Sequence, residues 1–161
     1  MNTAMFLVIF GLLLLVSPFA YAQNNTVQWL DFEALDDSLQ RKAKAVFLYF
    51  QTDWCSYCRK MDKRVFSKKE IAEVLNEQFY PVRMDAESND TIYFEGQAFI
   101  NREASYNRKG IHEIAKIFSR KEVGFVAPTI IVLDKDFRVK QQHYEYLHAE
   151  RLSKILNKEQ N

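Results

Sequence analysis

Residues 45–58, with the sequence AVFLYFQTDWCSYC, place a pair of cysteines shortly after an apolar run. The run at 45–50 is continuous and rich in β-branched and aromatic side chains, which is typical of a strand buried on both faces of a sheet. Cys55 and Cys58 are the 2 cysteines of the chain, and we predict that they open the helix that follows this strand. A Cys-x-x-Cys pair in such a setting indicates a thiol–disulfide redox motif.

The spacing of the two cysteines suits disulfide exchange. Two intervening residues let the second thiol reach back to the first, so a mixed disulfide with a partner can be resolved within one molecule. At the start of a helix, unpaired N–H groups and the positive end of the dipole stabilise a thiolate. As a structural staple the pair would contribute little, because a disulfide that closes so short a loop hardly constrains the unfolded chain. The sequence therefore favours a chemical role for Cys55 and Cys58.

Zinc binding is the main competing use of such a pair. Cys55 and Cys58, taken with His143 and His148, supply the sulfur and nitrogen ligands that structural zinc sites use. The cysteines and the histidines are much farther apart in sequence than in a zinc finger. We also expect His143 in a strand and His148 at the start of the next helix, and we expect no metal and no cofactor. His112 is expected on the solvent-facing side of a helix.

The first 22 residues have the features of an export signal. Residues 5–16 are almost entirely apolar, and Pro18 precedes an Ala-x-Ala pattern that ends at Ala22. We therefore predict a cleaved signal peptide at 1–22 and a mature domain at 23–161. No Lys or Arg precedes the apolar run, which leaves an uncleaved signal anchor as the alternative. In both cases the domain is exported.

The rest of the chain alternates between helix and strand patterns. Apolar residues recur at helical spacing over 32–43, 71–79 and 147–156, and the second of these helices is expected to begin with a capping box at Ser67 and Glu70. Strand-like runs lie at 80–85, 129–133 and 138–144, the last two joined by a short turn. This alternation predicts an α/β fold in layers, with some parallel strand pairing.

The segment at 86–110 has a less regular pattern. A small hairpin is expected on either side of Gly96, followed by a helix from Ile111 to Phe118. A run of this length inside a compact domain is often functional. The alternative, equally compatible with the sequence, is a segment that packs against the domain without a role in function.

Length and charge narrow the classes of function. A chain of 161 residues with 48% apolar residues corresponds to one globular domain after the export segment. The formal net charge is +1, which favours neither nucleic acid nor an anionic membrane surface as a partner. We expect no nucleic-acid partner. A basic stretch follows the cysteines and is more simply a solvated surface than a site for an acidic partner: Lys60, Lys63, Arg64, Lys68 and Lys69.

The chain resembles the thioredoxin family across about residues 27–157. Two segments carry the resemblance, DWCSYCRKM at 53–61 and, much later, VGFVAPT at 123–129. The resemblance implies an α/β thioredoxin fold, in which helices flank a central mixed β-sheet. It also implies that the segment at about 86–110 is an insertion ahead of the loop that contains the family's cis-proline.

The resemblance assigns roles to single residues. Cys55 would be the exposed attacking thiol and Cys58 the buried resolving thiol, and the two would form a redox-active disulfide. Pro128 would follow a cis peptide bond after Ala127, in a loop that faces the cysteines and binds substrate backbone. X–Pro bonds permit this, since cis costs only about 0.5–1 kcal/mol there. Trp54 is expected both to pack and to flank the substrate site.

Several residues depart from the family's pattern. A buried acid that assists proton transfer in thioredoxins stands six residues before the first cysteine, where this chain has Tyr49. Ser56 and Tyr57 match neither the Gly-Pro of cytosolic reductants nor the Pro-His of strong oxidants. Glu145 replaces a glycine that often lines the substrate surface. Redox chemistry is therefore expected with its direction open, and the family's usual general base is missing unless a Glu or Asp from elsewhere supplies it.

These observations predict an exported thiol–disulfide oxidoreductase that acts on protein disulfides through Cys55 and Cys58. We favour a reductase or exchange role, because no imidazole stands between the cysteines to stabilise the thiolate. The expected partners are a protein with a disulfide or dithiol and a redox-recycling partner, either soluble or membrane-bound. The expected location is the periplasm of a Gram-negative bacterium, with a membrane tether as the alternative. The alternative functions are a non-catalytic binding or chaperone module and, less favoured, a metal-binding protein.

Overall fold

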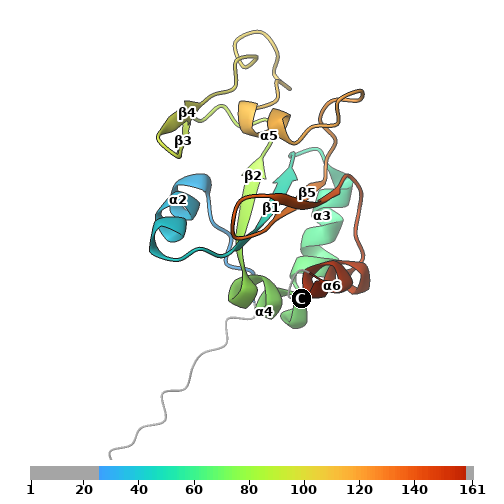
Figure 1. Cartoon of the computed structure of the whole chain (residues 1–161). Helices are drawn as coiled ribbons and strands as arrows, with labels where there is room; N and C mark the ends of the chain where they lie inside the picture. Colours follow the sequence, from blue (N-terminus) through green and yellow to red (C-terminus); the bar gives the residue numbers. More distant parts are fainter. Residues whose placement is uncertain (1–25, 159–161) are drawn as a thin grey trace, which may run out of the picture.

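A four-stranded mixed sheet lies at the centre of the domain (Figure 1). The computed structural model describes residues 26–158. The strands run in the order β2–β1–β5–β6, with bounds β1 Ala45–Gln51, β2 Phe79–Asp85, β5 Thr129–Leu133 and β6 Val139–His143. β2 is parallel to β1, whereas β5 is antiparallel to β1 and β6 is antiparallel to β5. The predicted mixed sheet is confirmed.

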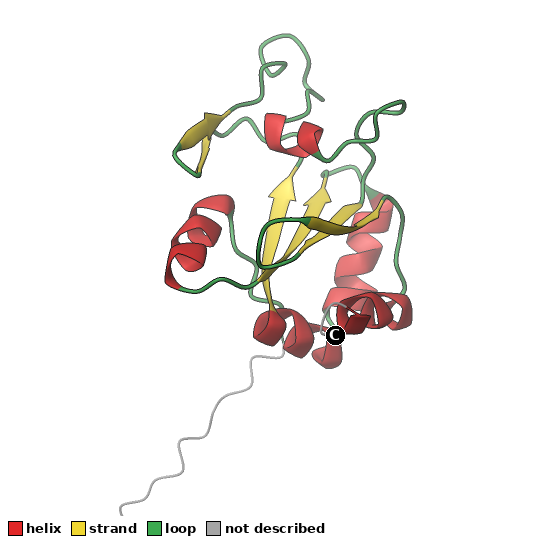
Figure 2. Cartoon of the chain, in the orientation of Figure 1, coloured by secondary structure: helices red, strands yellow, loops and turns green. Residues whose placement is uncertain are grey.

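Alternating side chains of β1 supply two separate cores, which explains why its sequence is continuously apolar. Phe47 and Tyr49 belong to the core under α3 (Ser56–Met61), its π-helical continuation η2 (Asp62–Phe66), α4 (Lys69–Gln78) and α6 (Ala149–Lys158). Val46, Leu48 and Phe50 face the opposite core, which is covered by α2 (Phe32–Arg41), α5 (Glu113–Ile117) and the hairpin of β3 (Ile92–Phe94) and β4 (Gln97–Phe99). Figure 2 shows the helices on both sides of the strands.

The helix starts follow local hydrogen bonding, with one departure from expectation. Asp31 caps α2, its carboxylate accepting from the backbone N–H of Ala34 at 2.7 Å. The capping box predicted for α4 is absent, because the helix begins after Lys68, which makes no side-chain capping bond. The Ser67 hydroxyl instead donates to the Lys63 carbonyl at 2.9 Å. It satisfies a carbonyl of the preceding π-helical turn and is not free to cap the next helix.

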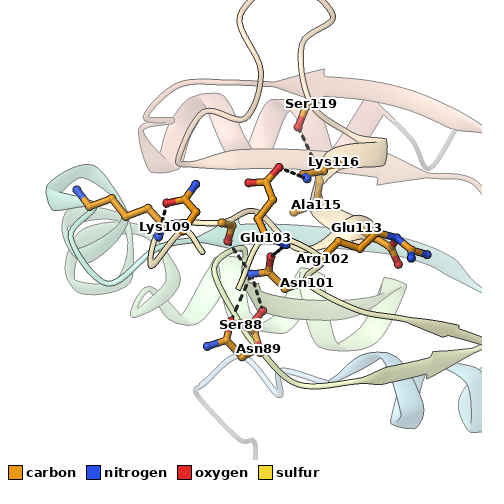
Figure 3. A network of polar contacts seen from close by, with 12 residues as sticks. Ser88, Asn89, Asn101, Arg102, Glu103, Lys109, Glu113, Ala115, Lys116 and Ser119 are labelled. Atoms are coloured by element: carbon orange, nitrogen blue, oxygen red, sulfur yellow. Dashed lines mark hydrogen bonds and ion pairs between the residues drawn. The ribbon is translucent and has the colours of Figure 1, made fainter. Parts of the chain in front are cut away.

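The inserted segment is held by the buried side chain of Asn101 (Figure 3). Its amide nitrogen donates to the carbonyls of Gly110 at 2.7 Å and Ser88 at 3.1 Å, and its amide oxygen accepts from the Glu103 backbone at 3.2 Å. The Glu103 carboxylate in turn binds Lys116 of α5. The segment is thus a folded part of the domain, and the predicted hairpin within it is confirmed as β3–β4.

His112 lies differently from the sequence-based expectation. The side chain is fully buried and caps α5, Nδ1 accepting from the Ile114 backbone at 3.2 Å. Nε2 lies 3.2 Å from the Asp90 carbonyl, which ties the inserted segment to the helix start. The expectation of a solvent-facing helix residue is wrong because the helix begins only after His112. Burial lowers the pKa of this imidazole.

The predicted signal peptide at 1–22 lies outside the described residues. Within 26–158, no helix is both long and apolar enough to cross a bilayer.

Candidate active site

The cysteine pair lies where β1 passes into α3. Cys55 is the N-cap residue of α3, with extended backbone angles, and its sulfur accepts from the backbone N–H of Cys58 at 3.0 Å. The Cys55 backbone N–H donates to the Thr52 carbonyl at 3.1 Å, which closes the turn between strand and helix. Cys55 and Cys58 form a disulfide with an S–S distance of 2.06 Å. The predicted position at a helix start is confirmed.

The expected exposure of Cys55 is not found in the oxidised protein. Cys55 is 3% exposed and Cys58 1%, and both belong to the core cluster that contains Tyr49. The side chains that reach solvent are those of the flanking Trp54 and Tyr57, at 56% and 58%. The two cysteines are therefore equally buried. They differ in that, within the described residues, only the Cys55 sulfur accepts a hydrogen bond from the turn, from the Cys58 backbone N–H.

The loop before β5 meets the cysteines from the far end of the sequence. Ala127 packs against the core cluster that includes both cysteines, and Pro128 is buried. The Ala127–Pro128 peptide bond is cis, as expected. Thr129 holds the loop, its hydroxyl donating to the Val126 carbonyl at 2.5 Å. The structure thus places Ala127 beside the core cluster that contains the two cysteines.

Trp54 is a surface residue held by the inserted segment and not a core residue. Its indole N–H donates to the Glu87 carboxylate at 2.8 Å. The Lys109 ammonium lies 5.5 Å from the ring centroid, within the range of a cation–π contact. The insertion therefore forms one border of the site. Sequence reasoning missed Glu87 and Lys109, and no motif marks either residue.

Aromatic side chains form the border on the other side. The Tyr57 ring lies 6.1 Å from that of Tyr146, in the segment before α6. The Lys60 ammonium lies 4.8 Å from the Tyr146 centroid, and the His148 ring packs edge-on against Tyr146 at 4.8 Å. One residue of the basic stretch, Lys60, thus has a specific aromatic partner beside the site. Tyr146 was not identified from the sequence.

A charged pair lies beside Tyr49, the residue that stands where the family has a buried acid. Tyr49 of β1 is the register partner of Arg83 on β2, and the Arg83 guanidinium forms an ion pair with Asp62 of η2. Burial raises the pKa of Tyr49, and the neighbouring Asp62 carboxylate adds to that shift. Burial also raises the pKa of Asp62, although Arg83 opposes it.

The proposed zinc ligands are not assembled. No group of three or more His, Cys, Asp or Glu side chains within 26–158 is placed to hold a metal ion. Nε2 of His143 lies 3.2 Å from the Gln141 side-chain oxygen, and His148 packs on Tyr146. The histidines have other neighbours, and the two sulfurs are bonded to each other.

Comparison with known proteins identifies the family. A family model described as a thioredoxin-like domain matches residues 32–160. The chain belongs to the thioredoxin-like family. No curated protein matches it in sequence.

Solved structures share the thioredoxin-like fold at low sequence identity. A DsbH oxidoreductase is 18% identical, with a TM-score of 0.57 over 84% of this chain and 85% of its own. A thioredoxin from Thermus thermophilus is also 18% identical, with a TM-score of 0.58 over 83% and 86%. The C-terminal domain of Neisseria meningitidis DsbD, in its reduced form, is 17% identical with a TM-score of 0.50 over 79% and 91%. The predicted fold is confirmed.

Family and motif together define the class of chemistry. A thioredoxin-like domain with a Cys-x-x-Cys disulfide is a thiol–disulfide oxidoreductase, and the predicted enzyme class is confirmed. Its two cysteines lie at the junction of β1 and α3, between Trp54 and Tyr57.

Proposed function

We propose that this thioredoxin-like protein is exported and that it reduces or exchanges disulfides in other proteins, with Cys55 as the attacking thiol and Cys58 as the resolving thiol. The observation that carries the proposal is the hydrogen bond of 3.0 Å from the Cys58 backbone N–H to the Cys55 sulfur. In the reduced protein the same N–H, together with the positive end of the helix, stabilises a thiolate on Cys55. Cys58 receives no such bond from the turn and has the role of the second thiol.

The reaction is two successive thiol–disulfide exchanges. The Cys55 thiolate attacks one sulfur of the partner disulfide, which forms a mixed disulfide and releases the other partner sulfur as a thiolate. The Cys58 thiolate then attacks Cys55, which forms the intramolecular disulfide and releases the second partner thiolate. The partner disulfide is reduced and the Cys55–Cys58 dithiol is oxidised. A recycling partner has to restore the dithiol.

Trp54, Ala127 and Pro128 are proposed to bind the partner around its reacting sulfur. Ala127 lies against the cluster that holds both cysteines, so a chain that contacts this loop is next to the disulfide. The exposed Trp54 ring offers apolar contact area from the opposite border. Proteins with a disulfide or dithiol are therefore the substrate class that we propose.

The surroundings of Cys55 support the proposed direction of electron flow. Ser56 and Tyr57 supply no cation between the cysteines, so less stabilises the reduced, thiolate form than in a strong oxidant. The apolar run and Ala-x-Ala pattern at 1–22 support export. We accordingly propose a reductase or exchange enzyme in the periplasm of a Gram-negative bacterium, with an uncleaved N-terminal tether as the alternative.

The reduction potential of the Cys55–Cys58 pair tests this proposal. The protein is equilibrated in glutathione buffers and the thiols are trapped with a mass tag, with Cys55→Ser as the control that cannot cycle. We expect a value near the figure of about −270 mV that is typical of thioredoxin. A value near about −120 mV, as in a strong oxidant, would contradict the direction. If the cysteine pair cannot be oxidised and reduced at all, the proposed enzyme function is wrong and the non-catalytic binding module is favoured.

A further inference from the structure

Cys58 has to lose a proton inside the core before it can act as a nucleophile. Only 1% of the residue is exposed, and it shares an apolar cluster with Tyr49, Met61 and Val65. The thiolate is the reactive form in disulfide exchange, and apolar surroundings disfavour it. Resolution of a mixed disulfide on Cys55 therefore calls for a group near Cys58 that accepts the thiol proton.

Asp62 stands one helical turn after Cys58. Its backbone N–H donates to the Cys58 carbonyl, so the two residues have the i, i+4 spacing that brings Cβ atoms to within about 5–6 Å. The Asp62 side chain is 34% exposed. Its carboxylate therefore lies at the border between the core cluster and solvent, on the part of the helix surface that Cys58 shares.

Arg83 holds the Asp62 carboxylate against the sheet. The Arg83 guanidinium forms an ion pair with Asp62 and lies over two rings, 5.4 Å from the Tyr49 centroid and 5.2 Å from that of Trp29. Arg83 on β2 and Tyr49 on β1 are the charged and titratable groups that face Asp62 from the sheet, and Lys63 follows it on η2. The ion pair keeps the carboxylate from rotating freely into solvent.

Two buried polar atoms of this cluster have no hydrogen-bond partner among residues 26–158, the Tyr49 hydroxyl and Nε of Arg83. Burying such atoms unpaired is unfavourable, and they concentrate where a structure serves chemistry. Burial raises the pKa of Asp62 above its ordinary value even with Arg83 beside it. A carboxylate with a raised pKa is a stronger base toward a thiol than an exposed aspartate.

We infer that the Asp62 carboxylate accepts the Cys58 proton during resolution of the mixed disulfide, and that Arg83 is the positioning residue for Asp62. The inference rests on the proposed function and names the group that performs its second step. The Cys58 proton passes to an Asp62 oxygen, and the Cys58 thiolate attacks the Cys55 sulfur. The bond between Cys55 and the partner breaks, and the partner leaves as a thiolate. Asp62 then releases its proton to solvent.

Single-turnover kinetics with Asp62→Asn test this inference. Reduced protein is mixed with a disulfide-linked fluorescent peptide pair, and acid quenching with mass spectrometry separates mixed-disulfide formation from its resolution. We expect Asp62→Asn to slow resolution by about 10²-fold at neutral pH, the lower end of the usual effect of a general base. Formation should change far less. The loss should diminish at alkaline pH, where hydroxide removes the Cys58 proton without Asp62.

Matched variants separate proton transfer from general damage. Glu70→Gln removes an exposed carboxylate from the first turn of α4 and should leave both steps unchanged. Asp62→Glu keeps a carboxylate and should recover most of the resolution rate. If Asp62→Asn resolves as fast as Glu70→Gln over the whole pH range, the inference is wrong and the proposed function stands. If the unaltered protein forms no mixed disulfide, the proposed function itself fails.

If Asp62→Asn does not fold, a measurement on the unaltered protein tests whether Asp62 and Cys58 exchange a proton. Carbon NMR of the Asp62 carboxyl group in the reduced protein should show two titration steps, its own above the ordinary value of 3.8 and a second that coincides with the Cys58 thiol. Absence of the second step would show that the two groups are not coupled, and would overturn the inference.

Discussion

Tyr49 and Tyr80 lie on the paired strands β1 and β2. The hydroxyl of Tyr80 is hydrogen-bonded, whereas, within the described part of the chain, that of Tyr49 is not. The Tyr49 hydroxyl is buried with no partner among residues 26–158. The Tyr80 hydroxyl donates to the carbonyls of Lys42 at 3.1 Å and Ser38 at 3.3 Å. The two side chains therefore form a matched pair in which the same substitution removes an unsatisfied group in one case and a bonded group in the other.

We predict opposite effects of Tyr49→Phe and Tyr80→Phe on the free energy of unfolding. Tyr49→Phe removes a polar atom buried without a bond, so stability should be unchanged or raised by up to about 1 kcal/mol. Tyr80→Phe leaves two carbonyls with one partner fewer and should lower stability by about 0.5–1.5 kcal/mol. Denaturant unfolding of the oxidised proteins measures both. A loss for Tyr49→Phe as large as for Tyr80→Phe would mean that the Tyr49 hydroxyl has a bonded partner in solution.

Single residues also show where sequence reasoning reaches its limit. The turn from β1 into α3 could be predicted, because the apolar run and the cysteine spacing are local signals in 45–58. The pairing of Asp62 with Arg83 could not, since it depends on the register of β1 with β2, which no local pattern specifies. The sequence shows that Tyr49 stands where the family has an acid. For the same reason it does not show which carboxylate lies near Tyr49 in the fold.

At the scale of elements, the inserted segment at 86–110 is the part of the fold that was hardest to predict from the sequence. The hairpin within it follows a turn signal around Gly96 and was predictable. The burial of His112 and Asn101 was not, because polar residues in a charged neighbourhood resemble surface. Their bonds run to backbone groups of Ser88, Asp90 and Gly110, so they are visible only once the segment is folded back on itself.

Asn101→Ala should loosen the loop at 101–110 while leaving the sheet intact. It removes the bonds to Ser88, Gly110 and Glu103 and leaves the buried Gly110 carbonyl and the half-buried Ser88 carbonyl with one partner fewer each, a local loss of about 1–3 kcal/mol. We expect faster hydrogen exchange of the backbone amides in 101–110, read by mass spectrometry, with β1 and β5 unchanged. Asn107→Ala, which removes one bond to the exposed Lys109 backbone, is the control. Equal exchange in both variants would show that Asn101 does not hold the loop.

At the scale of the whole molecule, the two halves of the site come from segments about seventy residues apart in the chain. Trp54 and the cysteines follow β1, whereas Ala127 and Pro128 precede β5, and β1 and β5 are neighbours in the sheet. Both motifs could be recognised in the sequence, and the antiparallel pairing of β1 with β5 explains why they meet. The exposure of Cys55 was predicted wrongly, because the disulfide draws both sulfurs into the core cluster.

Export is a property of the chain with its N-terminal segment. If the protein is exported as we propose, it is cleaved after Ala22, and this can be measured. The proposed chemistry needs an environment in which partner proteins carry disulfides, and cytosolic proteins rarely do. We expect the protein expressed with its own N-terminus in a Gram-negative host to be released by osmotic shock with the intact mass of residues 23–161. Replacement of Ala20 and Ala22 by Leu removes the small residues of the cleavage site and should leave a membrane-attached, uncleaved chain. Ala4→Leu, far from the site, should be processed normally. A full-length, membrane-attached unaltered protein would establish the signal anchor instead, and a full-length protein in the cytosol would refute export.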